Sequence, residues 1–144
     1  MTRDVIALAS DHAGVEMKLA LKEAAQARGL EVLDLGAHDE GSVDYPDMAD
    51  TLAAAMADGR AARGVLVCGS GIGISIAANR HRHVRAALCH SAETARLARQ
   101  HNDANVLAMG ARVIPPETAK ACLEAFLDTP FEGGRHALRV EKLG

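Results

Sequence analysis

The sequence predicts an α/β protein, a three-layer α/β/α sandwich built around a five-stranded parallel sheet. Short apolar runs rich in Val, Leu and Ala alternate five times with segments of helical spacing, and the connections between them are short. Alternation of this kind implies a parallel sheet with helices on both faces. Hydrophobic residues make up 49% of the chain and aromatic residues only 2%, so the core is expected to consist of small aliphatic side chains. Since 144 residues is near the commonest domain size, we expect one domain over residues 1–144.

The five strands are predicted from apolar, often β-branched runs that are too short for helices. The first and third runs are apolar throughout, which is typical of strands buried on both faces. The second run alternates apolar with acidic residues, so one of its faces is expected to be wetter. The predicted strands cover residues 4–9, 30–35, 64–68, 84–89 and 105–109.

A helix is predicted after each strand from helical spacing bounded by prolines and capping residues. The boundary signals are Gly29 and Gly59 as C-caps, Pro46 as an opening proline, Ser91 as an N-cap and the Pro115–Pro116 pair. The predicted helices begin near Val15, cover 47–57 and 74–79, follow Ser91, and run from Pro115 to about Leu127. A basic tail over residues 133–144 ends the chain.

The strand order decides where a ligand would bind. We expect the flavodoxin-like, Rossmann-like order 2-1-3-4-5, which places the topological switch point between the first and third strands. Ligands bind there at the carboxyl ends of the strands. These two ends carry Ser10-Asp11-His12 and Cys68-Gly69-Ser70. The topology and the polar residues therefore predict one crevice.

Charge and cysteine content exclude several classes of function. The formal net charge is −3 and the pI is about 6.1, which argues against electrostatic binding to nucleic acid or to an anionic membrane. The three cysteines are widely spaced and form no CxxC pair. With no predicted signal segment and no long apolar run, a soluble protein of the reducing cytoplasm is expected.

The stretch from Gly64 to Arg80 combines a buried strand, a glycine-rich turn and the start of a short helix. Backbone N–H groups exposed at such a turn, together with the helix dipole, favour a bound anion or a developing oxyanion. A nucleotide P-loop would need a Lys after its last glycine, and here Ile74 follows Gly73. A dinucleotide fold would need an acidic residue at the end of the next strand, which ends in Leu88-Cys89-His90.

Five motifs, in order along the chain, resemble the family of ribose 5-phosphate isomerase type B, which includes the galactose 6-phosphate isomerase subunits. They are DHAG at 11–14, DYP at 44–46, CGSGIGISIAANR at 68–80, RQHNDANVLAMGAR at 99–112 and EGGRHALRV at 132–140. The resemblance implies an aldose–ketose isomerase, an intramolecular oxidoreductase, that interconverts D-ribose 5-phosphate and D-ribulose 5-phosphate through a cis-enediolate. It implies no cofactor and no metal.

For catalysis, the resemblance implies that Cys68 acts as the base in its thiolate form. Some family members carry another residue in place of this Cys and use a Glu further along the helix, but here Cys68 is present and the helix offers Ile and Ala. A helix N-terminus stabilises a thiolate, which agrees with this role. The cradle for the enediolate would be formed by the backbone amides of Gly69, Gly71 and Gly73 with the Ser70 hydroxyl. Taken alone, Cys68 could equally pack as a small apolar residue.

Ring opening and substrate binding are assigned by the same resemblance. His101 matches the acid that protonates the ring oxygen of the closed sugar, and Asn102 follows it; a lone His at a helix end is otherwise commonly a cap. The expected phosphate ligands are Arg135 and Arg139, which are four residues apart on one helix face, with His12 and Arg112. Asp11 would bind a sugar hydroxyl and Tyr45 would contact the sugar. From their residue types alone, a solvated basic tail, a turn-capping Asp and a surface Tyr are the simpler readings.

His101 presents a geometric difficulty, because it follows the fourth helix and precedes the fifth strand. It should therefore lie at the amino edge of the sheet, a strand length away from the crevice at the carboxyl edge. We therefore expect a homodimer in which a second subunit supplies His101 and Asn102 to the site. Whether dimers pair into tetramers stays open.

Three alternatives to the ribose 5-phosphate reading remain open. The same chemistry could act on galactose 6-phosphate, allose 6-phosphate or a tetrose or tetrulose phosphate, since the expected phosphate ligands would bind the phosphate group of each. The fold could be a non-catalytic phosphosugar-binding module, or, against the two missing features noted above, a nucleotide-binding domain. His81 and His83 form an HxH pair that could hold a metal, but arginines surround them and no third ligand is evident in the sequence, so no metal site is expected.

Overall fold

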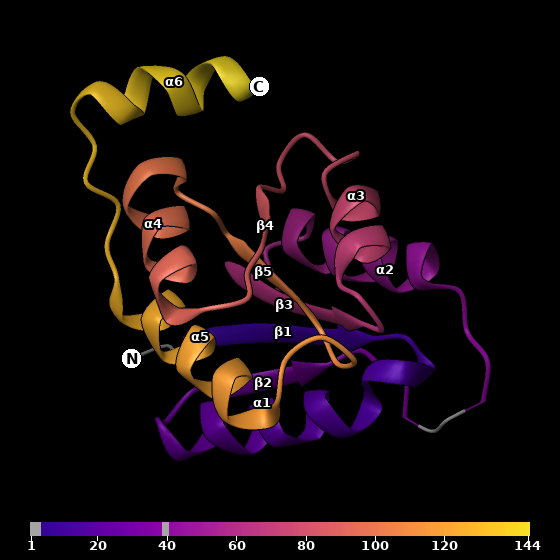
Figure 1. Ribbon diagram of the computed structural model, residues 1–144. Coiled ribbons are helices and arrows are strands. Elements are labelled where there is room, and N and C mark those ends of the chain that lie inside the picture. The colour runs from indigo at the N-terminus through magenta and orange to yellow at the C-terminus, as the bar shows by residue number, and fades with distance from the viewer. Residues whose placement is uncertain (1–3, 39–40) are drawn as a thin grey trace.

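Five strands form one parallel sheet at the centre of the structure, and helices cover both of its faces (Figure 1). The computed structural model describes residues 4–38 and 41–144. The strands are β1 (Val5–Ser10), β2 (Glu31–Asp34), β3 (Arg63–Cys68), β4 (Ala86–Leu88) and β5 (Val106–Gly110). The helices are η1 (His12–Gly14, a 3-10 turn), α1 (Val15–Ala27), α2 (Tyr45–Ala57), α3 (Ile72–Ala78), α4 (Ala92–Asn102), α5 (Pro116–Asp128) and α6 (Arg135–Leu143). The predicted α/β sandwich is confirmed.

The order of the strands is β2-β1-β3-β5-β4, so the predicted order 2-1-3-4-5 is wrong for the last two strands. All five residues of β5 are buried, whereas the three residues of β4 are only partly buried. A fully buried strand needs a partner on each side, so β5 takes the inner position and β4 the edge. As a result the carboxyl end of β5 lies beside the carboxyl end of β3, with Gly110 opposite Cys68.

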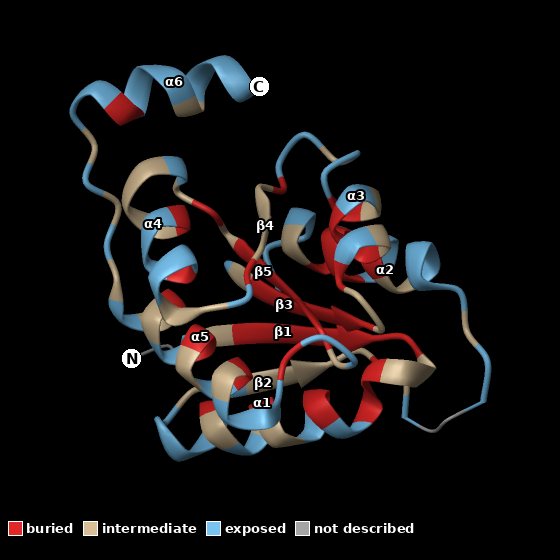
Figure 2. Ribbon diagram, viewed as in Figure 1, coloured by how far each residue is buried: buried red, intermediate tan, exposed pale blue. Residues whose placement is uncertain are grey.

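Both faces of the sheet are buried, as Figure 2 shows for β1, β3 and β5. Side chains alternate between the two faces along each strand. On β1, Ile6 and Leu8 point into a core shared with α1, α4 and α5, while Ala7 and Ala9 point into a core shared with α2 and α3. Cys68 belongs to the α2–α3 side of the sheet. Alanines on both sides allow the helices to lie close to the sheet, as the scarcity of aromatic residues predicts.

The capping residues end the helices where the sequence predicts. Gly29 and Gly59 follow α1 and α2 with φ values of 84° and 78°, which a residue with a side chain rarely adopts. Ser91 caps α4 by accepting a hydrogen bond from the Thr94 amide at 3.2 Å, and the Thr94 hydroxyl completes a capping box. Pro46 and Pro116 lie in the first turns of α2 and α5.

The C-terminal helix α6 is set apart from the sheet, at the outer end of α4 (Figure 1). Of its nine residues only His136 is buried, and Leu138 is 59% exposed. The predicted basic tail or helix is therefore a helix, which meets α4 through His136 and ends close to Arg82. None of the helices in the described ranges combines the length and the apolar character of a membrane span.

Candidate active site

A hollow of about 550 Å³ lies at the carboxyl edge of the sheet, where β1, β3 and β5 end. Its lining includes seven of the residues singled out from the sequence. They are Asp11, Tyr45, Cys68, Gly69, Ser70, Gly73 and Arg112. Exposed apolar side chains of Ile72 and Val113 complete the wall. The predicted crevice at the switch point is thus present.

Cys68 is the last residue of β3 and borders the hollow with 4% of its surface exposed. The Gly71 amide donates a hydrogen bond to Cys68 Sγ at 3.1 Å. A backbone N–H aimed at the sulfur is thus placed where it can donate to a bound or transient negative charge. Helix α3 begins directly after Gly71, so its N-terminal end faces the Cys68 sulfur. These contacts suit a thiolate base.

The glycine-rich turn has no room for side chains at its two tightest points. Gly71 has a φ of 81°, and a Cβ there would lie 2.6 Å from Leu88 Cδ1 and 2.7 Å from the Met109 carbonyl carbon. A Cβ on Gly73 would lie 2.6 Å from the ring of Tyr45. The Ser70 hydroxyl accepts a hydrogen bond from the Ile72 amide at 3.1 Å and keeps its own proton for donation. The turn therefore holds its amides and this hydroxyl in fixed positions beside Cys68.

Strand β5 brings Arg112 to this turn. The Ala111 amide donates to the Cys68 carbonyl and the Arg112 amide to the Gly69 carbonyl, both at 2.9 Å. The guanidinium lies over Gly69, since a Cβ on that residue would be 3.3 Å from Arg112 Nη1. Gly110 allows this approach, because a Cβ there would lie 2.4 Å from the Ser70 carbonyl oxygen. An exposed cation therefore stands at the mouth of the hollow.

Asp11 and His12 follow β1 on the other side of the hollow. The Asp11 carboxylate accepts a hydrogen bond from the Ala13 amide at 3.0 Å, so it caps its own turn while it lines the hollow. His12 accepts a hydrogen bond on Nδ1 from the Val43 amide at 3.3 Å. Its other ring nitrogen can then carry the proton and donate to an anion.

A buried ion pair supports the loop that follows β2 and lies beside the end of β1, which we call the loop behind β1. The fully buried Lys18 places Nζ 2.6 Å from both the Asp34 carboxylate and the Ala37 carbonyl. Burial disfavours the ionised form of Asp34, but the hydrogen bonds from Lys18 and from the Gly36 amide outweigh it and lower the pKa of this carboxyl. The loop in turn pairs with Ser10, whose amide donates to Gly36 and whose carbonyl accepts from Ala37. The sequence reasoning missed this support.

The other predicted residues lie on α4 and α6. His101 and Asn102 end α4, and the ring of His101 stacks on that of His136 with 4.3 Å between centroids and 14° between planes. Arg135 and Arg139 lie one turn apart on α6 and are exposed. None of these residues lines the Cys68 hollow.

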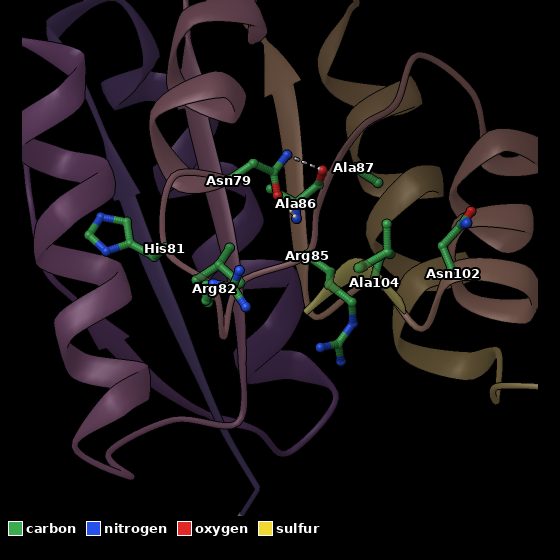
Figure 3. Close-up of a pocket in the computed structure, with 10 residues that line it drawn as sticks. Asn79, His81, Arg82, Arg85, Ala86, Ala87, Asn102 and Ala104 are labelled. Atoms are coloured by element: carbon green, nitrogen blue, oxygen red, sulfur yellow. Dashed lines mark hydrogen bonds between the residues drawn. The ribbon is translucent and has the colours of Figure 1, made fainter. Parts of the chain in front are cut away.

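A second hollow of about 420 Å³ lies on the side of the sheet where β4 and β5 begin. Figure 3 shows Arg82, Arg85 and Asn102 around it, with Asn79 hydrogen-bonded to the backbone of Ala86. Asn102 thus faces a different hollow from Cys68.

The register of the sheet separates Cys68 from His101 within one chain. Gly64 pairs with Val106 at the amino end of β5, and Cys68 pairs with Gly110 at its carboxyl end. These two pairs are four residues apart, which is about 13 Å along a strand. Since His101 precedes β5, it lies beyond the amino end of this span. Within one chain Cys68 and His101 therefore lie toward opposite ends of the sheet, as the sequence predicts.

Comparison with known families adds the decisive observation. The family model described as Ribose/Galactose Isomerase matches residues 6–143. The chain belongs to the ribose/galactose isomerase family. It is therefore an isomerase, as the motifs indicate.

Members of the ribose/galactose isomerase family with different names are similar to this chain. The ribose-5-phosphate isomerase B of Escherichia coli is 45% identical over 138 residues, which cover 96% of this chain and 93% of that protein. The D-erythrulose-4-phosphate isomerase of Pectobacterium atrosepticum is 46% identical over 140 residues, which cover 96% and 92%. The solved structure of ribose 5-phosphate isomerase B from Anaplasma phagocytophilum is 51% identical, with a TM-score of 0.93 and coverage of 100% and 99%.

Cys89, Cys122, His81 and His83 of this isomerase lie outside the Cys68 hollow. Burial raises the pKa of Cys89, and burial together with the proximity of Cys89 raises the pKa of Cys122 to about 11. Both are therefore neutral thiols near pH 7. His81 Nε2 lies 2.8 Å from Asp50 Oδ1 and His83 Nε2 lies 2.7 Å from the Ala53 carbonyl, so the HxH pair does not converge on a common point.

Gly110 and the Lys18–Asp34 pair are the residues of the site that sequence reasoning missed. Gly110 stands inside a motif that carries the family resemblance, but its importance depends on β5 lying next to β3. A lysine at an inward position of the first helix, with an acidic residue in the second strand, was the available signal for the ion pair. It becomes informative only once the helix face is known.

Proposed function

We propose that this isomerase interconverts D-ribose 5-phosphate and D-ribulose 5-phosphate, with the Cys68 thiolate as the base. In the open-chain aldose the thiolate takes the proton from C2, and the electron pair moves to give a cis-enediolate. Return of the proton to C1, with transfer of the O2 proton to O1, yields the ketose. The substrate is oxidised at one carbon and reduced at its neighbour, so electrons balance within it. The observation that carries this proposal is the Gly71 amide on Cys68 Sγ at 3.1 Å, at the edge of a hollow.

The enediolate oxygens would be held by the glycine-rich turn. Gly69, Ser70 and Gly73 line the hollow beside Cys68, so their amides and the Ser70 hydroxyl, together with the Gly71 amide next to the sulfur, would stabilise the developing negative charge. The Asp11 carboxylate can accept a hydrogen bond from a sugar hydroxyl, and the Tyr45 ring can contact the sugar chain, since both line the same hollow. These groups belong to one chain.

Ring opening would use His101 and Asn102 of a second copy of the chain. Ribose 5-phosphate is mostly a closed ring, so an acid must protonate the ring oxygen before the base can act. The sheet separates His101 from Cys68 within a chain, which supports a homodimer with a shared site. Arg135 and Arg139 of the second copy, with His12 and Arg112 of the first, would bind the phosphate. The separate, exposed position of α6 supports this arrangement.

The test is turnover by purified protein, in EDTA, across aldose phosphates of four to six carbons. We expect a clear preference for ribose 5-phosphate, and a loss of at least about 10³-fold in kcat for Cys68→Ala with phosphate-competitive binding retained. Cys89→Ala is the matched control, because it removes a buried thiol that does not line the hollow and should keep turnover.

Other outcomes separate the alternatives. Preference for a four-carbon sugar would move this chain toward the activity named for the Pectobacterium relative, with the same mechanism. Preference for galactose 6-phosphate or allose 6-phosphate would likewise change only the substrate. Sugar-phosphate binding without turnover on any substrate would identify a binding module and overturn the proposal.

The three free cysteines support the cytoplasmic setting that the sequence predicts.

A further inference from the structure

Three potential metal ligands converge where the segment before α6 crosses the last turn of α4. One ligand atom from each of His101, Glu132 and His136 lies within 4.8 Å of the other two. His136 Nε2 is 3.7 Å from Glu132 Oε1, and the His136 ring stacks on His101 at 4.3 Å. Among residues 4–38 and 41–144, this is the one group of three such side chains at this spacing.

The backbone fixes the three side chains relative to one another. The Glu132 amide donates to the Gln100 carbonyl at 3.1 Å, which ties this segment to α4 one residue before His101. The His136 amide donates to the Gly133 carbonyl at 3.0 Å, across a turn in which Gly133 and Gly134 have φ values of 70° and 54°. His136 itself is 8% exposed. All three ligands therefore sit on anchored backbone, and the exposed Glu132 carboxylate already lies beside the His136 ring.

The donor set selects a class of ion. Two imidazole nitrogens and a carboxylate are ligands that suit Zn²⁺, Ni²⁺ and similar divalent transition metals, whereas Mg²⁺ and Ca²⁺ prefer oxygen. Donor atoms around a tetrahedral zinc ion are about 3.3 Å apart, so the three atoms must close by about 1.5 Å at most. Because the two rings are nearly parallel, one of them must rotate for its lone pair to meet the ion.

The nearby charges set the strength of such a site. Arg135 and Arg139 lie on α6 with His136 and repel a cation, whereas the Glu132 carboxylate beside His136 attracts one, so affinity below that of a structural zinc site is expected.

We infer that His101, Glu132 and His136 form a binding site for a divalent transition-metal ion, represented by Zn²⁺, and that occupancy inhibits the isomerase. The ion would occupy the imidazole nitrogen of His101 that ring opening needs, so inhibition rests on the proposed function. Binding does not. This role is separate from catalysis, which requires no metal in the proposed mechanism.

The binding test is calorimetric titration of ZnCl₂ into chelator-stripped protein in the Cys68→Ala background, because the Cys68 thiolate is itself a zinc ligand. We expect one site per chain, weakened at least about tenfold by Glu132→Gln and by His136→Gln. His81→Gln is the matched control, since it removes the histidine of the His81–Asp50 pair, and it should leave the affinity unchanged. Zinc affinity that is unchanged in both Glu132→Gln and His136→Gln would overturn the site.

The inhibition test uses the full-length enzyme with Cys68 intact. We expect Zn²⁺, but not Mg²⁺, to inhibit turnover, EDTA to reverse it, and Glu132→Gln to raise the inhibitory concentration at least about tenfold. Equal sensitivity of wild type and Glu132→Gln would assign the inhibition to Cys68 and overturn this part of the inference. Failure of the proposed function would show instead as no turnover in EDTA, and the calorimetric result would still decide the site.

Discussion

The carboxyl edge of the sheet and the corner between α4 and α6 are built in opposite ways. At the carboxyl edge, Cys68 is buried, its sulfur accepts a backbone hydrogen bond, and the surrounding turn has no room for added side chains. At the α4–α6 corner, Arg135 and Arg139 are exposed and α6 buries a single residue, His136. The turn at the carboxyl edge is tightly packed, whereas the α4–α6 corner is mostly exposed to solvent.

In the proposed mechanism these regions are two halves of one site. The first half would carry the base and a cradle for a developing negative charge, and the second the acid and the cations, so each would lack what the other supplies. Each half is at an opposite end of the sheet, which a single chain cannot fold together. A second copy can join them at no cost to the packing of either sheet, because the groups at the α4–α6 corner are already at the surface.

The largest expected effect comes from mixing two inactive variants. Cys68→Ala and His101→Asn should each lose nearly all turnover of ribose 5-phosphate. If the site is shared, a dimer of one chain of each kind contains one intact site out of two, and the mixed dimer should show roughly half of wild-type turnover. The measurement is activity of the co-expressed, doubly tagged dimer compared with each variant alone.

A site formed within one chain would give a different result, since every site in the mixed dimer would then carry one substitution. Turnover of the mixture no greater than that of its components would contradict the shared site. The double variant Cys68→Ala, His101→Asn, co-expressed with wild type, is the control for subunit exchange.

The next effect tests how rigidly the carboxyl edge is supported. Lys18→Met leaves Asp34 buried without its main partner, and removing one member of a buried ion pair costs about 3–5 kcal/mol. Arg28→Met is the control, because it breaks the exposed pair with Asp128 and should cost about 1 kcal/mol or less. Chemical denaturation gives both values. Equal costs for the two variants would show that the loop behind β1 does not depend on Lys18.

A smaller effect is expected from Gly110→Ala. The added Cβ would lie 2.4 Å from the Ser70 carbonyl oxygen, and overpacking of this kind costs about 1–3 kcal/mol. Because the displaced atoms belong to the turn beside Cys68, kcat should fall more than KM rises. Gly29→Ala adds a Cβ in open space at a positive φ, so it should cost about 1 kcal/mol and leave kcat unchanged. If Gly110→Ala and Gly29→Ala had the same kcat, Gly110 would not help to position the turn beside Cys68.

Much of the carboxyl edge could be predicted from the sequence because its signals are local. An apolar run followed by Cys68 and three spaced glycines specifies a strand, a turn and a helix start within 17 residues, from Gly64 to Arg80. The capping residues Gly29, Gly59 and Ser91 also act on their immediate neighbours, and all three predictions are confirmed.

The errors and omissions concern contacts between distant segments. The exchange of the last two strands depends on how deeply β4 and β5 are buried, and both are short and apolar in the sequence. His101 stacks on His136, which lies 35 positions further along the chain. The sequence of α6 predicts a basic tail or helix but not where that segment packs. Local patterns carry no information on such pairings, so the arrangement of the α4–α6 corner required the structure.

The last prediction uses pH to test how the Lys18 charge stabilises the carboxyl edge, through the Lys18→Met penalty. In the wild type Lys18 helps to hold the pKa of Asp34 below its ordinary value of 3.8, so the stability from this pair is complete above that value and is lost as the pH falls through the lowered pKa. In Lys18→Met, burial without that partner favours the neutral carboxyl, so the variant is relieved as acid protonates Asp34. The penalty measured by denaturation should therefore decrease steadily from pH 7 toward pH 3, whereas the small Arg28→Met penalty stays within about 1 kcal/mol throughout. A Lys18→Met penalty that is constant with pH would mean that lost packing of the lysine chain, and not its charge, stabilises the loop at the carboxyl edge.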